Sequence, residues 1–408
     1  MPDQPAAAAE SSRLRLNLSI LSIVKFNFAT YLTIGLPLAV LPGFVHDGLG
    51  YSAFWAGVVI SLQYLATLIS RPHAGRYADS WGPKKVVVLG LVGSLISGLC
   101  ILLSALLAGQ TILSLALLCL GRILLGIGQS FCGTGTSLWG VAKVGSLHIG
   151  RVISWNGIVT YGAMAIGAPL GVMIFRHGGL LLLSAVIIAI SLLAIVLALP
   201  RAAVKGSKAK PLPFRAVLGK VYGFGLLLAM GSAGFGVIAT FITLFYREKG
   251  WDGAAFALTL FSAAFIGARL LFPNAINKQG GLRVASLCFA IEAAGLFMVA
   301  ASFDPWMAKL GALLTGAGFS LVFPAIGVVA VKVVPQQNQG SALATYTAFM
   351  DLSLGITGPI AGFIMSYAGV SLVYLLAALL VCFALFCTLR MLKHQPDDAA
   401  DEVHRSSS

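Results

Sequence analysis

One short polar segment decides the fold of this sequence: Arg71-Pro-His-Ala-Gly75-Arg-Tyr-Ala-Asp79-Ser-Trp-Gly82-Pro-Lys84-Lys85. It separates two long apolar runs. Gly75 allows two helices to approach closely, and Gly82 allows a turn with positive φ. Lysines such as Lys84 and Lys85 are attracted to the anionic inner leaflet of a membrane. The segment therefore predicts a short basic loop between two membrane helices, although an ordinary solvated loop can carry the same charges.

The composition on either side of this loop is that of a polytopic membrane protein. The chain has 408 residues, of which 58% are hydrophobic and 10% are charged, and its mean hydropathy is +0.94. Soluble domains carry about 25% charged residues. At ~20 residues per spanning helix, twelve spans would use roughly 240 residues. This balance excludes a water-soluble enzyme, a secreted disulfide scaffold, a receptor with a large ectodomain and an outer-membrane barrel.

Apolar runs of spanning length predict twelve transmembrane helices, and the first run is too long for a signal-peptide core. The runs are near 18–44, 53–72, 84–108, 112–136, 152–174, 178–199, 217–245, 254–273, 283–302, 308–330, 342–367 and 370–390. The predicted organisation is a cytoplasmic tail (1–17), a six-helix bundle (18–200), a basic cytoplasmic linker (201–216), a second six-helix bundle (217–390) and a cytoplasmic tail (391–408).

The basic residues predict the orientation of these helices. Of the 27 Lys and Arg residues, most fall in loops and tails on the side of the N-terminus, which predicts that both termini are cytoplasmic. A basic stripe for nucleic acid is not apparent, so we expect membrane lipids and no nucleic acid as partners. The six cysteines lie in apolar runs without the spacing of a disulfide framework or a metal site. Four bases lie within the spans: Lys25, Arg71, Arg122 and Arg269.

The two halves repeat each other. At an offset of 198 residues, Arg71 and Gly82 match Arg269 and Gly280. At an offset of 190 residues, Gly126, Gly128, Gly150 and Pro169 match Gly316, Gly318, Gly340 and Pro359. The matches occur in the same order and at equivalent places in the topology. They predict a parallel duplication of a six-helix unit, which is one architecture of secondary transporters.

The loop resembles the signature G-x-x-x-D-(R/K)-x-G-(R/K)-(R/K) of the major facilitator superfamily, with Ser80 and Pro83 in place of two basic residues. Arg122, Gly126 and Gly128 resemble the R-x-x-x-G-x-G motif of its drug:proton antiporter groups, and the whole chain is similar to arabinose-efflux-permease-like members. The resemblance implies an all-α fold of two pseudo-symmetric six-helix bundles that alternate access to a site lined mainly by spans 1, 4, 7 and 10. It also implies that the loop residues Gly75, Asp79, Gly82, Lys84 and Lys85 form a gate, with Asp79 as a latch whose second-half counterpart is Asn277.

Polar residues inside the first four spans are candidates for the transport pathway. Arg122, Gly126 and Gln129 share one helix face by their i, i+4, i+7 spacing. An arginine at mid-span costs about 2.5–3.5 kcal/mol on insertion scales, so we expect Arg122 to face an aqueous cavity or a partner. An anchor bonded to backbone carbonyls is the structural alternative. Asn27 and Tyr31 form a plausible cavity lining on span 1.

Two acids lie within the second half. Asp351 shares a face with Gly355, Gly358 and Gly362 and is therefore predicted to point at a packed interface. Glu292 has no strongly polar neighbour one turn away, so it either serves packing or pairs with a base on another helix. We expect proton coupling at Asp351 before Glu292. Helix packing and hinge positions are expected at Gly126, Gly128, Gly167, Pro169, Gly358 and Pro359.

Enzyme signatures such as a Walker loop, H-E-x-x-H or G-x-S-x-G are missing from the sequence. We therefore expect no enzymatic activity and no cofactor, with the proton gradient as the energy source. The predicted function is proton-coupled efflux of a small polar organic solute or drug by a monomer in the bacterial inner membrane. The alternatives are a proton symporter or facilitator for uptake and, from another class, a non-transporting receptor or assembly subunit.

Overall fold

The computed structural model describes residues 4–145, 148–204, 214–272, 274–334 and 339–393, and this part of the chain is helical without any strand. Parts of the expected linker 201–216 and tails 1–17 and 391–408 lie outside the described residues. The long helices of the first half are α1 (Gln4–Leu38), α3 (Ala53–Trp81), α4 (Pro83–Leu106), α5 (Thr111–Val144) and α6 (Ile149–Ala198), with the short α2 (Leu41–Gly43) and the π-helix η1 (Phe44–Gly48) after α1. Those of the second half are α7 (Phe214–Glu248), α8 (Ala254–Leu271), the short α9 (Ala275–Gln279), α10 (Gly281–Ala300), α11 (Pro305–Lys332), α12 (Gln339–Ala368) and α13 (Val370–Lys393).

Eleven helices of the described chain are long and apolar enough to cross a membrane, where the sequence predicts twelve spans. The difference lies in α6, whose apolar part runs from residue 154 to residue 198. Gly178 and Gly179 leave the helical region of φ and ψ in the middle of α6, and Gly179 has a φ of +61°. This glycine pair reverses the chain without a loop, so α6 contains the fifth and sixth predicted spans.

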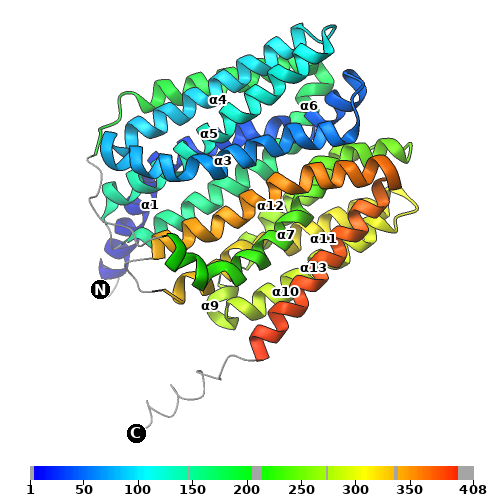
Figure 1. The fold of residues 1–408 in the computed structure, drawn as a ribbon. Helices are drawn as coiled ribbons and strands as arrows, with labels where there is room; N and C mark the ends of the chain where they lie inside the picture. Colours follow the sequence, from blue (N-terminus) through cyan, green and yellow to red (C-terminus); the bar gives the residue numbers. More distant parts are fainter. Residues whose placement is uncertain (1–3, 146–147, 205–213, 273, 335–338, 394–408) are drawn as a thin grey trace.

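The surface of the bundle is apolar, as a protein in lipid requires. Exposed side chains include large hydrophobic residues from most of the long helices, among them Leu103, Leu193, Leu271 and Phe363. A soluble monomer rarely exposes contiguous apolar patches of more than a few hundred Å². The fold is therefore that of a membrane-spanning bundle. Figure 1 shows the blue-to-green helices of the first half beside the green-to-red helices of the second half.

The duplication seen in the sequence recurs in the helix packing. A Cβ atom added to Gly126 of α5 would overlap the carbonyl oxygen of Gln63 in α3, and one added to Gly316 of α11 would overlap the carbonyl oxygen of Phe261 in α8. The same relation holds for the pairs Gly128 with Gly90 and Gly318 with Cys288. Because both partners shift by the two repeat offsets, the halves pack their helices in the same way.

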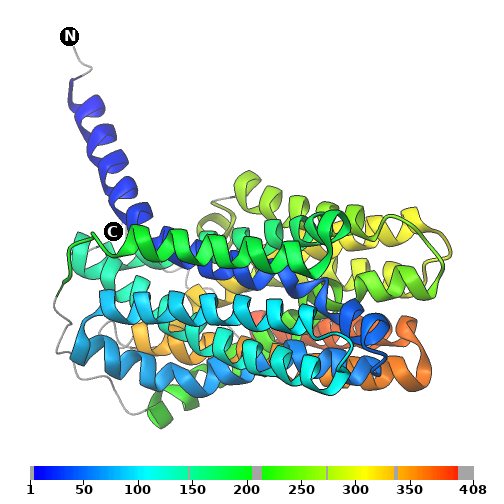
Figure 2. The ribbon, with the colours of Figure 1, turned by 90° about the horizontal axis from the view of Figure 1, so that it is seen from above.

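The two halves meet along two equivalent seams. In one seam α3 packs on α12, and in the other α6 packs on α8. Gly358 lies against the backbone of Gly57, and Gly362 lies against that of Ala53, so α3 and α12 run antiparallel in close contact. Both α1 and α13 have their outer chain ends at one end of the bundle (Figures 1 and 2), which we name the termini side. The other end is the far side.

The expected packing positions are mostly in close contact with a neighbouring helix. Gly167 lies against the backbone of Gly35 in α1, and Gly358 touches Ser61 as well as Gly57. Pro169 and Pro359 lie inside α6 and α12, respectively. These contacts support the predicted packing role of the two glycines, and both helices continue through their prolines.

The loop after α3 differs in part from its prediction. Gly82 makes the expected turn with a φ of +90°, but Gly75 faces open space within 4 Å, so the expected close approach at Gly75 is wrong. Lys84 donates a hydrogen bond to the carbonyl oxygen of Leu199 at 2.6 Å, because the end of α6 offers unpaired carbonyl groups there. Lys85 is exposed. The side chain of Asp79, and with it the latch, lies outside the described residues.

The glycine contacts lead to a prediction about stability. We expect Gly126→Ala and Gly316→Ala each to destabilise the protein by about 1–3 kcal/mol, because a new methyl group would displace backbone in a packed seam. Gly75→Ala is the matched control, since its methyl group meets open space. Thermal unfolding in detergent measures the effect. A melting temperature of Gly126→Ala equal to that of Gly75→Ala would show that the α3–α5 contact is not tight.

Candidate functional site

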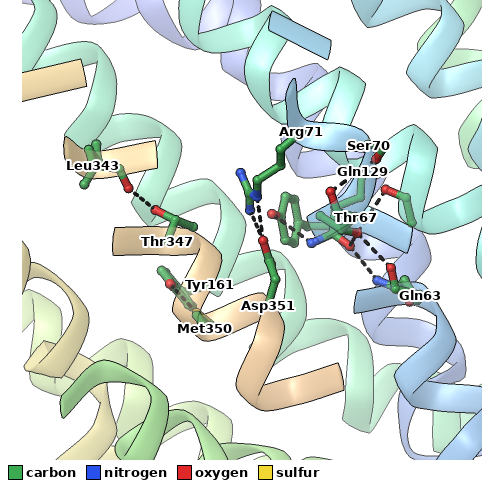
Figure 3. A network of polar contacts seen from close by, with 12 residues as sticks. Gln63, Thr67, Ser70, Arg71, Gln129, Tyr161, Leu343, Thr347, Met350 and Asp351 are labelled. Carbon is green, nitrogen blue, oxygen red and sulfur yellow. Dashed lines mark hydrogen bonds and ion pairs between the residues drawn. The ribbon is translucent and has the colours of Figure 1, made fainter. Parts of the chain in front are cut away.

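An ion pair joins the two halves within the membrane-spanning helices. The Nε and Nη2 atoms of Arg71 in α3 each lie 2.5 Å from Oδ2 of Asp351 in α12. The side chain of Asp351 is 5% exposed and that of Arg71 is 22% exposed. Figure 3 shows the two side chains meeting between their helices. A charged pair inside the α3–α12 seam therefore holds the first half against the second.

The glycine face of α12 explains why Asp351 points at Arg71. Gly355, Gly358 and Gly362 lie against Leu65, Gly57 and Ala53 of α3, so this face of α12 is the one that packs on α3. Asp351 lies on the same face, as the sequence predicts. The sequence analysis did not identify Arg71 as its partner. Its position within a span was the available signal, because a charge in a span needs a counter-charge or a cavity.

A polar layer of the first half lies next to this ion pair. Oε1 of Gln129 in α5 accepts hydrogen bonds from Nε2 of Gln63 at 2.7 Å and from Oγ1 of Thr67 at 3.1 Å. Nε2 of Gln129 donates to the hydroxyl of Tyr31 in α1 at 3.1 Å. Tyr31 also interacts electrostatically with Arg71 and Asp351. Figure 3 shows this network beside the ion pair. The layer thus brings Tyr31 and Gln129 together with Asp351.

Asn27 connects α1 to α6. Its Nδ2 donates a hydrogen bond to Oγ1 of Thr160 at 2.8 Å, and its buried Oδ1 has no hydrogen-bond partner among the described residues. Thr160 precedes Tyr161 in α6. Asn27 is therefore a polar group inside the first half with one acceptor atom still available.

Arg122 differs from its prediction of a cavity or a partner. Its side chain is 0% exposed, and none of its three side-chain nitrogens has a hydrogen-bond partner within the described part of the chain. Tyr64 is its electrostatic neighbour. The glycines beside it, Gly121 and Gly126, hold α5 tightly against α4 and α3, which closes the space around the guanidinium. Arg122 is a buried cation that lacks a compensating group in this conformation.

Glu292 is the matching orphan in the second half. It is fully buried in α10, and neither carboxyl oxygen has a hydrogen-bond partner among the residues described. Its carboxyl group lies against Gly231 and Gly234 of α7. The pairing with a base considered for Glu292 is therefore absent from the described structure, and Glu292 lies apart from the Arg71–Asp351 pair.

The second seam holds an arginine as well. Nε and Nη2 of Arg269 in α8 donate to the carbonyl oxygen of Ser320 at 3.0 and 2.9 Å. Its guanidinium carbon lies 4.8 Å from the ring centre of Tyr161 in α6 and 5.1 Å from that of Phe265. The hydroxyl of Tyr161 donates to Sδ of Met350 at 3.1 Å. This contact between α8 and α6 also crosses from one half to the other.

A pocket of about 530 Å³ opens between the halves on the far side. Its lining comes from α1, η1, α6, α7 and the start of α8, and it includes Asp47, Arg176, Arg247 and Asp252. Arg247 forms an ion pair with Asp47, which also joins the two halves. In this conformation the halves are therefore separated by a pocket on the far side and joined by Arg71 and Asp351 toward the termini side.

This fold, with duplicated six-helix halves and charged groups between them, defines a membrane transporter. The family model of the Major Facilitator Superfamily matches residues 26–281 and 253–407, and the chain belongs to that family. The sequence is 67% identical over 406 residues to the "Uncharacterized MFS-type transporter YhhS" of Escherichia coli (strain K12), with 100% of both chains covered. The detail of the sequence predicts the same YhhS-type relationship. The family and these relatives are transporters and not enzymes.

Solved structures with low sequence identity share the fold. The D-xylose-proton symporter has a TM-score of 0.76 at 16% identity, covering 93% of this chain and 98% of that one. The human organic anion transporter MFSD10 has a TM-score of 0.69 at 14% identity, covering 91% of this chain and 99% of that one. The major facilitator fold predicted from the loop, the repeat and the hydropathy is thus confirmed.

Proposed function

We propose that this protein is a proton-coupled exporter of a small polar organic solute or drug that works by alternating access. It acts as a monomer in the bacterial inner membrane with both termini cytoplasmic, so that the termini side is the cytoplasmic side. The observation that carries the proposal is the buried ion pair between Arg71 and Asp351, because it joins the halves through a carboxylate that a proton can neutralise.

The energy of this pair matches the task. Removing one partner of a buried ion pair costs about 3–5 kcal/mol. Moving a two-state equilibrium from 1:99 to 99:1 requires about 5.5 kcal/mol. A proton on Asp351 removes its negative charge and leaves Arg71 uncompensated, so the seam between α3 and α12 loses much of the attraction that keeps it closed. Protonation therefore favours opening on the termini side.

The solute site is assigned to the interior of the first half. Arg122 has unused donors, and Asn27 has an unused acceptor. Tyr31 and Gln129 supply further polar groups beside the ion pair. A polar solute that reached them would satisfy groups that the empty protein leaves without partners, which is a favourable exchange in a dry interior. Glu292 is a second candidate for the proton, because it is buried and unpaired.

Uptake by proton symport or facilitated diffusion is the alternative on the same fold. It is favoured by the likeness to a protein titled D-xylose-proton symporter. The same ion pair serves it, since coupling of a proton to opening does not set the direction in which solute moves. A non-transporting receptor or assembly subunit is the alternative from another class.

Proteoliposomes that contain a pH-sensitive dye distinguish these functions. A panel of sugars, amino acids, organic acids and drugs is added while internal pH is followed. We expect at least one solute to move against protons, as export by exchange requires. Movement of solute and protons in the same direction would indicate symport, and solute movement without protons would indicate a facilitator. The absence of any movement across the panel would contradict transport and favour the receptor.

A further inference from the structure

The repeat relates the two arginines in the seams and also the residues that face them. The offset of 198 residues places Arg269 at the position of Arg71, and the offset of 190 residues places Asp351 at the position of Tyr161. The structure shows both relations in space. Arg71 pairs with Asp351 across one seam, and Arg269 stacks on Tyr161 across the other. The duplicated unit therefore has a carboxylate in one seam and a phenol ring in the other.

This difference leaves one positive charge uncompensated. Arg71 is neutralised by the carboxylate of Asp351. Arg269 has a carbonyl oxygen and two aromatic rings as partners, and none of these carries a formal charge. Tyr161 interacts electrostatically with Arg269, Arg71 and Asp351, so these groups belong to one layer. The layer has two cations and one anion, and an intramembrane cation is expensive unless it is paired.

Arg269 also has unused donors. A guanidinium has five N–H groups arranged to bind carboxylate or phosphate oxygens in pairs. Nε and Nη2 share a single acceptor, the carbonyl oxygen of Ser320. Nη1 makes no hydrogen bond within the described chain, and the side chain is only half-buried. The outer edge of the guanidinium can therefore accept an anionic group without loss of an existing partner.

We propose that Arg269, backed by the ring of Tyr161, binds the anionic group of the transported solute, so that the substrate is an organic anion. The inference rests on the proposed function and names its substrate class. A carboxylate, sulfonate or phosphate group takes the place in the α6–α8 seam that Asp351 takes in the α3–α12 seam. With substrate bound, both seams are held by an arginine and an anion. Tyr161 acts as a positioning residue that keeps the carboxylate position vacant for the solute.

A substituted carboxylate tests the site without any ligand. Tyr161→Glu places a carboxyl group near the position of the ring that faces Arg269, and Tyr161→Gln is its matched uncharged control. Both lose the same aromatic packing. At pH 8 we expect the Glu variant to melt ~2–4 °C or more above the Gln variant, and we expect this difference to disappear in an Arg269→Gln background. Equal melting temperatures, or a lower one for Tyr161→Glu, would overturn the proposal.

Small anions test the same site in the unmodified protein. Benzoate, benzenesulfonate, phenyl phosphate and acetate are each compared with an uncharged analogue of the same size in thermal unfolding of the full chain. We expect at least one anion, and no uncharged analogue, to stabilise the unmodified protein and Tyr161→Phe, which keeps the ring. Arg269→Gln and Tyr161→Glu should not respond. Equal stabilisation by the uncharged analogues, or none by any anion, would overturn the proposal.

These measurements separate the two proposals. A protein that binds anions at Arg269 but moves neither solute nor protons in proteoliposomes would contradict the proposed function alone. A transporter that exchanges an uncharged solute for protons would contradict the anion site alone.

Discussion

Replacing Arg122 by methionine is expected to raise the melting temperature of the protein and to abolish transport. The guanidinium is fully buried without a hydrogen-bond partner among the described residues, and an arginine at mid-span costs about 2.5–3.5 kcal/mol on insertion scales. Methionine is flexible enough to fill the same space. The variant should gain a large part of this energy while losing the donors that the solute needs.

Thermal unfolding and solute uptake into proteoliposomes, measured on one preparation, test this expectation. Arg122→Lys is the control, because it keeps the charge but lacks the planar set of donors. We expect Arg122→Lys to melt like the unmodified protein and to retain part of its transport. Full transport in Arg122→Met would remove Arg122 from the pathway. A lowered melting temperature would show that the guanidinium stabilises the fold.

Asp351→Asn should have the opposite effect on stability. It leaves Arg71 in the α3–α12 seam without its counter-charge, and loss of one partner from a buried pair costs about 3–5 kcal/mol. The double variant Arg71→Gln/Asp351→Asn removes both charges. We therefore expect it to melt well above Asp351→Asn alone, as residues in direct contact are not additive. Melting temperatures that add independently would contradict an energetic coupling between the two residues.

Glu292→Gln is the matched control for the acid itself. Glu292 is also buried in the second half, but its carboxyl oxygens have no partner in the described chain. We expect this variant to retain stability and proton movement, whereas Asp351→Asn should lose proton movement. If Glu292→Gln lost proton movement and Asp351→Asn kept it, the proton site would be Glu292.

The sequence was sufficient for the family and the duplication because both depend on local patterns. Glycines at fixed spacing, apolar runs and the two offsets are visible along the chain, and the structure repeats them in its contacts, as Gly126 and Gly316 show. The fifth and sixth spans were predicted as separate helices, and they are continuous in α6 except at Gly178 and Gly179. Two glycines can reverse a chain without the polar loop that separates spans elsewhere.

The candidate site was predicted less completely because it depends on pairs far apart in the chain. Helix periodicity places Asp351 on the packed face of α12, yet it does not tell which helix covers that face, and Arg71 is 280 residues away. The surroundings of Arg122 depend on how tightly Gly121 and Gly126 pack, which a motif does not show. The relation of Tyr161 to Asp351 is present in the offset of 190 residues, but only the arginines facing them give it meaning.

The central claim is that protonation of Asp351 opens the seam between α3 and α12 on the termini side. The other charged and titratable groups of this layer are Arg71, Arg269, Tyr31 and Tyr161, and Asp351 is the one that changes from charged to neutral on acidification. Its charge is present at high pH and lost as pH falls, so the attraction to Arg71 is lost in the same direction.

Spin labels at two exposed positions, Arg76 of α3 and Ala344 of α12, report this seam by electron–electron distance measurement in lipid nanodiscs. The account predicts a short distance at pH 8 and a longer one at pH 5 in the otherwise unmodified transporter, and the longer distance at both pH values in Asp351→Asn. A distance that stays the same at pH 8 and pH 5, or one that still changes with pH in Asp351→Asn, would contradict it.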